Sequence, residues 1–220
     1  MKITVVCPQP SHPVFPYLAR WTERAGDRHE IVLTSRLDEA VGGDVLFLIS
    51  CDQIVDRIIR SRYQKTLVVH SSDLPEGRGW SPQIWQILEG RSEIVISLLE
   101  AEDKVDSGDI WLKETLVFKG HELFDEINEK LYTLWLQMLD FAVDNFDKID
   151  PQPQPATGVT YYRRRTPEDS ELDPKESIES QFDLLRVADP LRYPAFVRLR
   201  GHKYEVLLKK VGLDHQTEKD

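Results

Sequence analysis

The chain has 220 residues, 40% of them hydrophobic, which suffices for one well-buried core and at most a small appended module. Its formal net charge of −10 argues against general nucleic-acid binding, because phosphate contacts need a surplus of Lys and Arg on some face. We find no apolar stretch near the roughly 20 residues that span a bilayer, and the first residues resemble a strand rather than a signal peptide. We therefore expect a cytoplasmic protein that binds neither nucleic acid nor membrane.

The first 70 residues alternate short apolar runs with amphipathic segments, which is typical of a parallel sheet covered by helices. The expected strands are residues 3–7, 30–34, 45–50 and 66–70. Two sets of apolar residues at helical spacing are expected to cover the sheet: Tyr17, Leu18 and Trp21, then Ile54, Ile58 and Ile59. The predicted fold class is α/β, with a Rossmann-like, mostly parallel sheet flanked by helices.

One edge of this sheet is the expected ligand site, because ligands of open parallel sheets bind beyond the carboxyl ends of the strands. Cys7, Ser50, Cys51 and His70 all fall there. The turn at residues 8–13 has no glycine for a close approach to pyrophosphate, which argues against a nicotinamide site. Two cysteines are too few for a disulfide framework or a metal cluster, so we expect no bound metal.

The segment after His70 is rich in turn residues up to Trp80 and then starts a helix, with Ser81 as the expected N-cap and Pro82 at the first helical position. Gly90 is expected to end this helix. The elements that follow are strands at 94–99 and 109–112, separated by an acidic loop, and a long helix at 122–146.

Alternating Pro and Gln at residues 151–155 predict a stiff linker, which divides the chain into a main domain, 1–150, and a small extension, 151–220. In the extension we expect a helix at 177–187 and a β-hairpin at 198–209 that turns at Gly201 and His202. Neither could hold a core alone, so we expect both to dock on the main domain or on a second subunit. The apolar tail segments are compatible with a homodimer.

Two motifs carry a family resemblance. Residues 70–82, which read His-Ser-Ser-Asp-Leu-Pro-Glu-Gly-Arg-Gly-Trp-Ser-Pro, and residues 105–110, Val-Asp-Ser-Gly-Asp-Ile, resemble the catalytic domain of N10-formyltetrahydrofolate-dependent formyltransferases. That family includes methionyl-tRNA formyltransferase, glycinamide ribonucleotide transformylase and sugar N-formyltransferases. Its Asp-x-Gly-Asp follows the histidine by about three dozen residues, as Asp106 follows His70 here. The resemblance covers residues 1 to about 150 and implies N10-formyltetrahydrofolate as co-substrate.

The tail adds a narrower resemblance, since residues 162–170 and 192–196 look like the tail of bacterial enzymes that formylate nucleotide-linked amino sugars, and the loop at 77–82 looks most like those near pseudaminic-acid biosynthesis. The implied acceptor is a nucleotide-linked 4-amino-4,6-dideoxy sugar used in surface glycan biosynthesis. The run of arginines at 163–165 is either a solvated strand end or a phosphate clamp. Trp80 and Trp85 are expected in the core rather than as stacking platforms.

The resemblance implies that an uncharged amine attacks the formyl carbon through a tetrahedral oxyanion, with His70 and Asp106 as the catalytic pair. His70 stabilises the oxyanion or takes the amine proton, while Asp106 orients His70 or collects the proton. The family asparagine two residues before the histidine falls on Val68, which cannot form hydrogen bonds. Losing such a donor typically costs about 100- to 1000-fold in rate. Ser72, Gln83 and Gln53 are candidate replacements by location.

The resemblance also assigns approximate ligand sites. The residues it places at the folate are Ile49, Ser50, Cys51, Gln53, Leu99 and Val105, and those at the acceptor are Ser72, Arg78, Gly79, Gln83 and Arg163. Two alternatives stay open. One is another enzyme of this fold, a purine transformylase or a formyl hydrolase; the other is a non-catalytic folate- or nucleotide-binding relative, favoured by Val68 and opposed by the retained His70 and Asp106.

Overall fold

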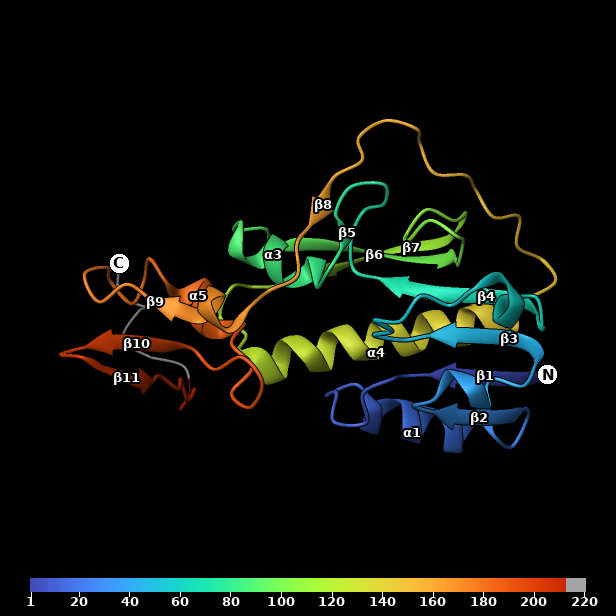
Figure 1. The fold of residues 1–220 in the computed structure, drawn as a ribbon, viewed down its shortest axis with the longest axis horizontal. Coiled ribbons are helices and arrows are strands. Elements are labelled where there is room, and N and C mark those ends of the chain that lie inside the picture. Colours follow the sequence, from blue (N-terminus) through green and yellow to red (C-terminus); the bar gives the residue numbers. More distant parts are fainter. Residues whose placement is uncertain (213–220) are drawn as a thin grey trace.

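The computed structural model describes residues 1–212, built on one six-stranded sheet with strand order β2-β1-β3-β4-β6-β7 (Figure 1). The strands are β1 (Lys2–Val6), β2 (Glu30–Thr34), β3 (Gly43–Leu48), β4 (Tyr63–His70), β6 (Glu93–Glu100) and β7 (Ile110–Val117). The first four pair in parallel, whereas β6 joins β4 and β7 in antiparallel. The mixed sheet, parallel over its first four strands, confirms the predicted fold class.

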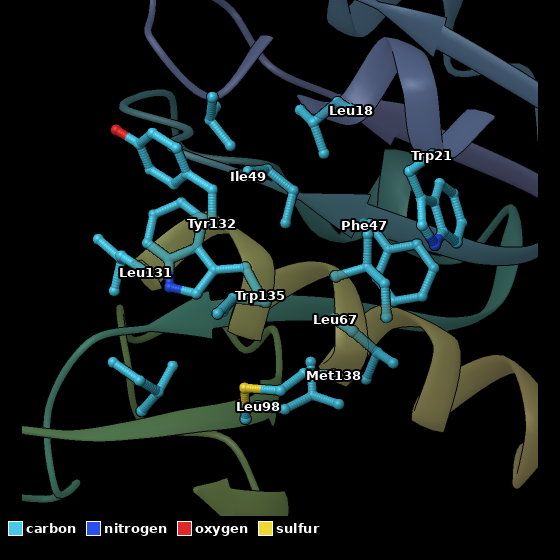
Figure 2. Packing of buried hydrophobic residues seen from close by; sticks show 14 of the residues in the cluster. Leu18, Trp21, Phe47, Ile49, Leu67, Leu98, Leu131, Tyr132, Trp135 and Met138 are labelled. Atoms are coloured by element: carbon cyan, nitrogen blue, oxygen red, sulfur yellow. The ribbon is translucent and has the colours of Figure 1, made fainter. Parts of the chain in front are cut away.

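Helices cover one face of the sheet with a large apolar core (Figure 2). The two long helices on this face are α1 (Phe15–Ala25) and α4 (Phe124–Asp144). The shorter helices of the structure are α2 (Arg57–Arg60), α3 (Pro82–Leu88) and α5 (Phe182–Arg186). Leu18 and Trp21 of α1 and Leu131 of α4 meet Phe47 and Leu67 of the sheet in this core. Each such side chain contributes about 1.5–3 kcal/mol by leaving water. Within residues 1–212, we find no helix long and apolar enough to cross a membrane.

The predicted long helix is shorter than expected at its start, because Glu122 belongs to the preceding turn. Its carboxylate accepts the N–H groups of Lys119 and Gly120 at 3.0 Å and pairs with Lys130. Burial opposes ionisation of Glu122, but these hydrogen bonds outweigh it and lower its pKa to about 2. The helix therefore begins at Phe124.

The predicted helix that carries Ile54, Ile58 and Ile59 is shorter than expected, and only part of its apolar side faces the sheet. The side chain of Asp56 accepts the Ile59 N–H as an N-cap, so α2 is only four residues long. Ile54 is 80% exposed and Ile58 69% exposed. Val55 and Ile59 pack instead into a smaller cluster on the other face of the sheet, around Leu46, Leu48 and Tyr63.

The end of the expected tail helix reaches the main core, whereas the hairpin packs on a small cluster within the extension. It holds β8 (Tyr161–Tyr162), β9 (Glu171–Leu172), β10 (Phe196–Leu199) and β11 (His202–Glu205). Leu172, Leu185 and Ala195 form the cluster, with Val197 of the hairpin packed against it. Val187 lies in the main core, so the expected docking on the main domain is confirmed for the helix and stays a prediction for the hairpin.

Two predicted tail elements have different bounds. The expected helix at 177–187 is confined to α5, because residues 177–181 form turns held by side-chain bonds such as Ser180 N–H to Ser177 Oγ at 3.0 Å. The hairpin spans 196–205 and turns at Arg200 and Gly201, one residue earlier than predicted. Both turn residues have positive φ, 51° and 81°, as a two-residue hairpin turn requires.

Candidate functional site

His70 ends β4 at the edge where β1 and β3 also end, as predicted. Its Nε2 lies 2.9 Å from the carbonyl oxygen of Gly77. Its Nδ1 lies 3.6 Å from Oδ1 of Asp106, and both side chains are only 8% exposed. The structure therefore brings the two predicted catalytic residues together in a buried pair.

Hydrogen-bond chemistry fixes which protons this pair holds. A carbonyl oxygen only accepts, so the Gly77 contact places a hydrogen on Nε2 of His70. The other nitrogen, Nδ1, then has a free lone pair when the ring is neutral, and it faces an aspartate oxygen. The space between Nδ1 and Asp106 accommodates one further proton.

Asp106 is held by the backbone around it. Its Oδ2 accepts the N–H of Gly79 at 2.9 Å, and its own φ is 54°, in the left-handed region. A Cβ at Gly108 would lie 1.9 Å from the Glu100 carbonyl oxygen, so only glycine fits there. Gly108 is therefore needed for the close approach of this loop to β6.

The loop between β4 and α3 is fixed by the extension. Within it, β5 (Arg78–Gly79) pairs in parallel with β8. Thr160 reinforces the pair, because its Oγ1 accepts the N–H of Gly77 at 2.8 Å and its carbonyl accepts that of Arg78 at 3.0 Å. Gly79, at φ 100°, approaches so closely that a Cβ would lie 2.4 Å from the Tyr162 carbonyl oxygen. The loop that contacts His70 and Asp106 thus depends on residues 160–162.

Gln154, in the predicted linker, is a site residue that sequence reasoning missed. Its Nε2 donates to the carbonyl oxygens of Asp106 at 3.0 Å and Gly108 at 2.8 Å. Its Oε1 accepts from Nη2 of Arg78 at 2.7 Å, and Arg78 is only 4% exposed. One amide therefore joins the two loops that hold the catalytic pair. The alternation of Pro and Gln was the available signal, since an extended segment can present such amides.

Val68 lies in an apolar row where the family asparagine would be. It pairs with Leu48 of β3 and Leu99 of β6, and it packs against the smaller core cluster. Of the three suggested replacements, Ser72 is buried beneath Gly77, Gln53 is exposed, and Gln83 is half-buried. The Ser72 hydroxyl makes no hydrogen bond within residues 1–212.

The residues assigned to the folate fall into a buried group and a group that reaches the surface. Ile49 and Leu99 are buried, so only their backbone could meet a ligand. The others reach the surface, namely Ser50, Cys51, Gln53 and Val105. Beside the first half of β4 lies a polar cavity of about 470 Å³. Its lining includes Arg57, Arg60, Lys65, Glu100 and Asp103, and it continues along the acidic loop that leads to Asp106.

The aromatic residues near the loop stack on arginines rather than filling the core. Trp80 is 39% exposed with the Arg164 guanidinium 4.6 Å from its ring centroid, so its predicted core position is wrong. Trp85 stacks on Tyr162 and carries Arg163 at 4.7 Å. Arg163, assigned to the acceptor, forms an ion pair with Asp169. Ser81 occupies the N-cap position of α3 as expected, but its side chain makes no capping bond.

Searches against family models found no match. Among curated proteins, the methionyl-tRNA formyltransferase of Rickettsia africae is 30% identical over 138 residues, which is 62% of this chain and 46% of that protein. The one from Rickettsia prowazekii is 30% identical over 148 residues, 67% of this chain and 49% of the relative. This chain therefore spans about half the length of the curated relatives it matches.

Solved structures share the fold across nearly the whole chain. Methionyl-tRNA formyltransferase from Clostridium thermocellum has a TM-score of 0.81 at 21% identity and covers 96% of this chain and 94% of its own. HypX from Aquifex aeolicus in complex with tetrahydrofolic acid has a TM-score of 0.76 at 17% identity, and the match covers 94% of this chain and 37% of HypX. A 4-N formyltransferase from Francisella tularensis has a TM-score of 0.70 at 18% identity, and the match covers 96% of this chain and 98% of that protein.

The fold, with a histidine and an aspartate buried at the sheet edge, matches that of the solved formyltransferases. In sequence, this chain is similar to the Rickettsia methionyl-tRNA formyltransferases over about half of their length.

Proposed function

We propose that this protein transfers the formyl group of N10-formyltetrahydrofolate to the amino group of a nucleotide-linked 4-amino-4,6-dideoxy sugar. The observation that carries the proposal is the buried His70–Asp106 pair at the ligand edge of a formyltransferase fold. The HypX structure with tetrahydrofolic acid supports the co-substrate, and the sugar N-formyltransferases among the structural relatives support the acceptor.

In the proposed reaction the acceptor nitrogen forms a bond to the formyl carbon and the bond from that carbon to N10 breaks. The amine must lose one proton and N10 must gain one. The His70–Asp106 pair can hold one proton between Nδ1 and Oδ1, so it suits a relay that takes the proton from the amine and returns it to N10. Positioned side chains in such roles contribute about 100- to 10,000-fold in rate.

The co-substrate is proposed to lie against the backbone of residues 49–53 and 99–105, next to the polar cavity. Tetrahydrofolate carries glutamate carboxylates, and the cavity lining holds the cations Arg57, Arg60 and Lys65. Arg57 is the best placed to meet a carboxylate, because Arg60 already pairs with Asp103 and Lys65 with Glu100. The first two arginines lie on α2, the short helix that leaves its isoleucines exposed. This assignment places the pterin end nearest to Asp106.

A second acceptor, methionyl-tRNA, is favoured by the names of the curated relatives. The charge of the chain opposes it, because 38 acidic residues against 28 basic ones make extended phosphate contacts unfavourable. A non-catalytic folate-binding role is favoured by Val68 alone. Retention of both His70 and Asp106 in one buried contact opposes it, since binding alone does not need that pair.

The test is an assay of purified protein with N10-formyltetrahydrofolate and two acceptor sets, nucleotide-linked 4-amino sugars and methionyl-tRNA. Tetrahydrofolate release and product mass are measured together. A His70→Ala variant should lose at least about 100-fold in rate, whereas His202→Ala, which removes an exposed histidine of β11, should not. Formylation of tRNA alone would replace the sugar acceptor, and folate binding without any product would support the non-catalytic role.

A further inference from the structure

Three consecutive arginines follow β8, and each has different surroundings. Arg163 makes a two-pronged ion pair with Asp169 beside its stacking on Trp85. Arg165 donates through Nη2 to the Asp169 carbonyl and to Ser170 Oγ, both at 3.2 Å. Within residues 1–212, the Arg164 guanidinium makes no hydrogen bond or ion pair and lies over the Trp80 ring. Arg164 is thus the arginine of this run that has unused donors.

Trp80 ties this cation to the candidate catalytic centre. It directly follows Gly79, whose N–H donates to Asp106, and its own N–H donates to the Tyr162 carbonyl at 3.1 Å. The Trp80 backbone is therefore held between the catalytic loop and the extension. An indole at this position lies at the rim of the site, and its partial exposure leaves it accessible to a bound molecule.

Stacking prepares the guanidinium for one kind of ligand. An arginine over an indole is attracted to the ring face and gives up part of its side-chain freedom before any ligand arrives. Its N–H donors point outward in the plane of the guanidinium, in a fork that matches two oxygens of a phosphate group. In a chain of net charge −10, one such cation favours a short anionic group over a long polyanion.

We propose that Arg164, held against Trp80, binds the diphosphate group of the acceptor. This inference rests on the proposed nucleotide-linked acceptor and specifies how that acceptor is recognised. Arg163 is already committed to Asp169, so the phosphate contact belongs to its neighbour. The folate is proposed to lie along other residues, 49–53 and 99–105, and is not expected to share this contact.

Calorimetric titration with free uridine diphosphate and thymidine diphosphate tests the inference directly. Arg164→Ala should weaken the binding of the better nucleotide by about 10- to 100-fold, as expected for losing a charge-assisted pair of hydrogen bonds. Arg164→Lys should recover part of that loss. The matched control is Arg36→Ala, which removes an exposed arginine paired with Asp38 and should change binding by less than about twofold. Melting temperatures of all variants check that they fold.

The outcomes separate the inference from the proposed function. Equal nucleotide binding by wild type and Arg164→Ala overturns the inference, even if sugar formylation is observed. Arginine-dependent nucleotide binding without formylation supports the inference and overturns the proposed reaction. In a protein that formylates a nucleotide sugar, the substitution should raise KM for the sugar and leave KM for the folate unchanged; equal KM values for the sugar would contradict it.

Discussion

Replacing Gln154 tests how the two loops of the site are held together. The Gln154→Ala variant loses a charge-assisted bond from Arg78 and two neutral bonds to the carbonyls of Asp106 and Gly108. A charge-assisted hydrogen bond contributes about 1.5–3 kcal/mol to stability, and a neutral one about 0.5–1.5 kcal/mol. Gln154 is half-buried, so water can replace part of them. We expect the free energy of unfolding to fall by about 2 kcal/mol, which lowers Tm by roughly 4–8 °C.

The effect on turnover should exceed the effect on folding. Release of the loop that carries Asp106 misplaces the carboxylate from His70, and kcat should fall by roughly 10- to 100-fold. Gln154→Glu separates the two effects, because a carboxylate can still pair with Arg78 but no longer donates to the carbonyls. Its stability loss should be smaller than that of the alanine variant, while its kcat loss should be similar.

The control is Gln152→Ala, in the same segment, because its exposed side chain bonds only to the Asp150 carbonyl within the described residues. Urea unfolding and steady-state formyl transfer are measured for all three variants. If Gln154→Ala matches Gln152→Ala in both stability and kcat, the amide does not support the site and the reasoning is refuted.

Three further predictions use other features. Gly79→Ala should lower stability by more than Gly90→Ala in urea unfolding, because both have positive φ but only the first meets backbone at 2.4 Å; equal losses would contradict the close approach. Val68→Asn should raise kcat at least about tenfold if a missing donor limits the rate, and an unchanged kcat in the transfer assay would show that another group supplies it. His12 has a pKa lowered to about 4 by burial, aided by Arg192. Its folded pKa lies below the usual 6.5, so stability is full above pH 6.5 and falls toward pH 4; His12→Gln should flatten this part of a denaturation profile.

Residue patterns predicted the sheet, and the family resemblance predicted that His70 and Asp106 act together; the structure brings the two side chains into contact, while their catalytic role stays a prediction. Buried parallel strands appear as apolar runs, and the spacing of the two motifs carried His70 and Asp106. Helix spacing was misleading at Ile54 and Ile58, since apolar periodicity does not show which segment the Asp56 cap will begin. Local hydrogen bonding decided that element.

Long-range hydrogen bonds could not be predicted in the same way. Gln154 and Thr160 contact residues 46–83 positions away in the chain, and no periodicity marks such partners. The segment 151–155 was predicted as a linker on composition, and its extended form is what lets Gln154 reach both loops. Whether residue 150 bounds an independent domain stays a prediction.

The pairing of β5 with β8 also has a consequence for the order of folding. Gly77 and Thr160 are separated by 83 residues, so we expect the loop at residues 77–79 to gain its main-chain partners only after most of the sheet and α4 have formed. During synthesis, the first strands and α1 leave the ribosome well before the segment that fixes the loop. The loop beside His70 and Asp106 therefore takes its final form late, and a nascent chain ending at residue 150 lacks the strand that holds it.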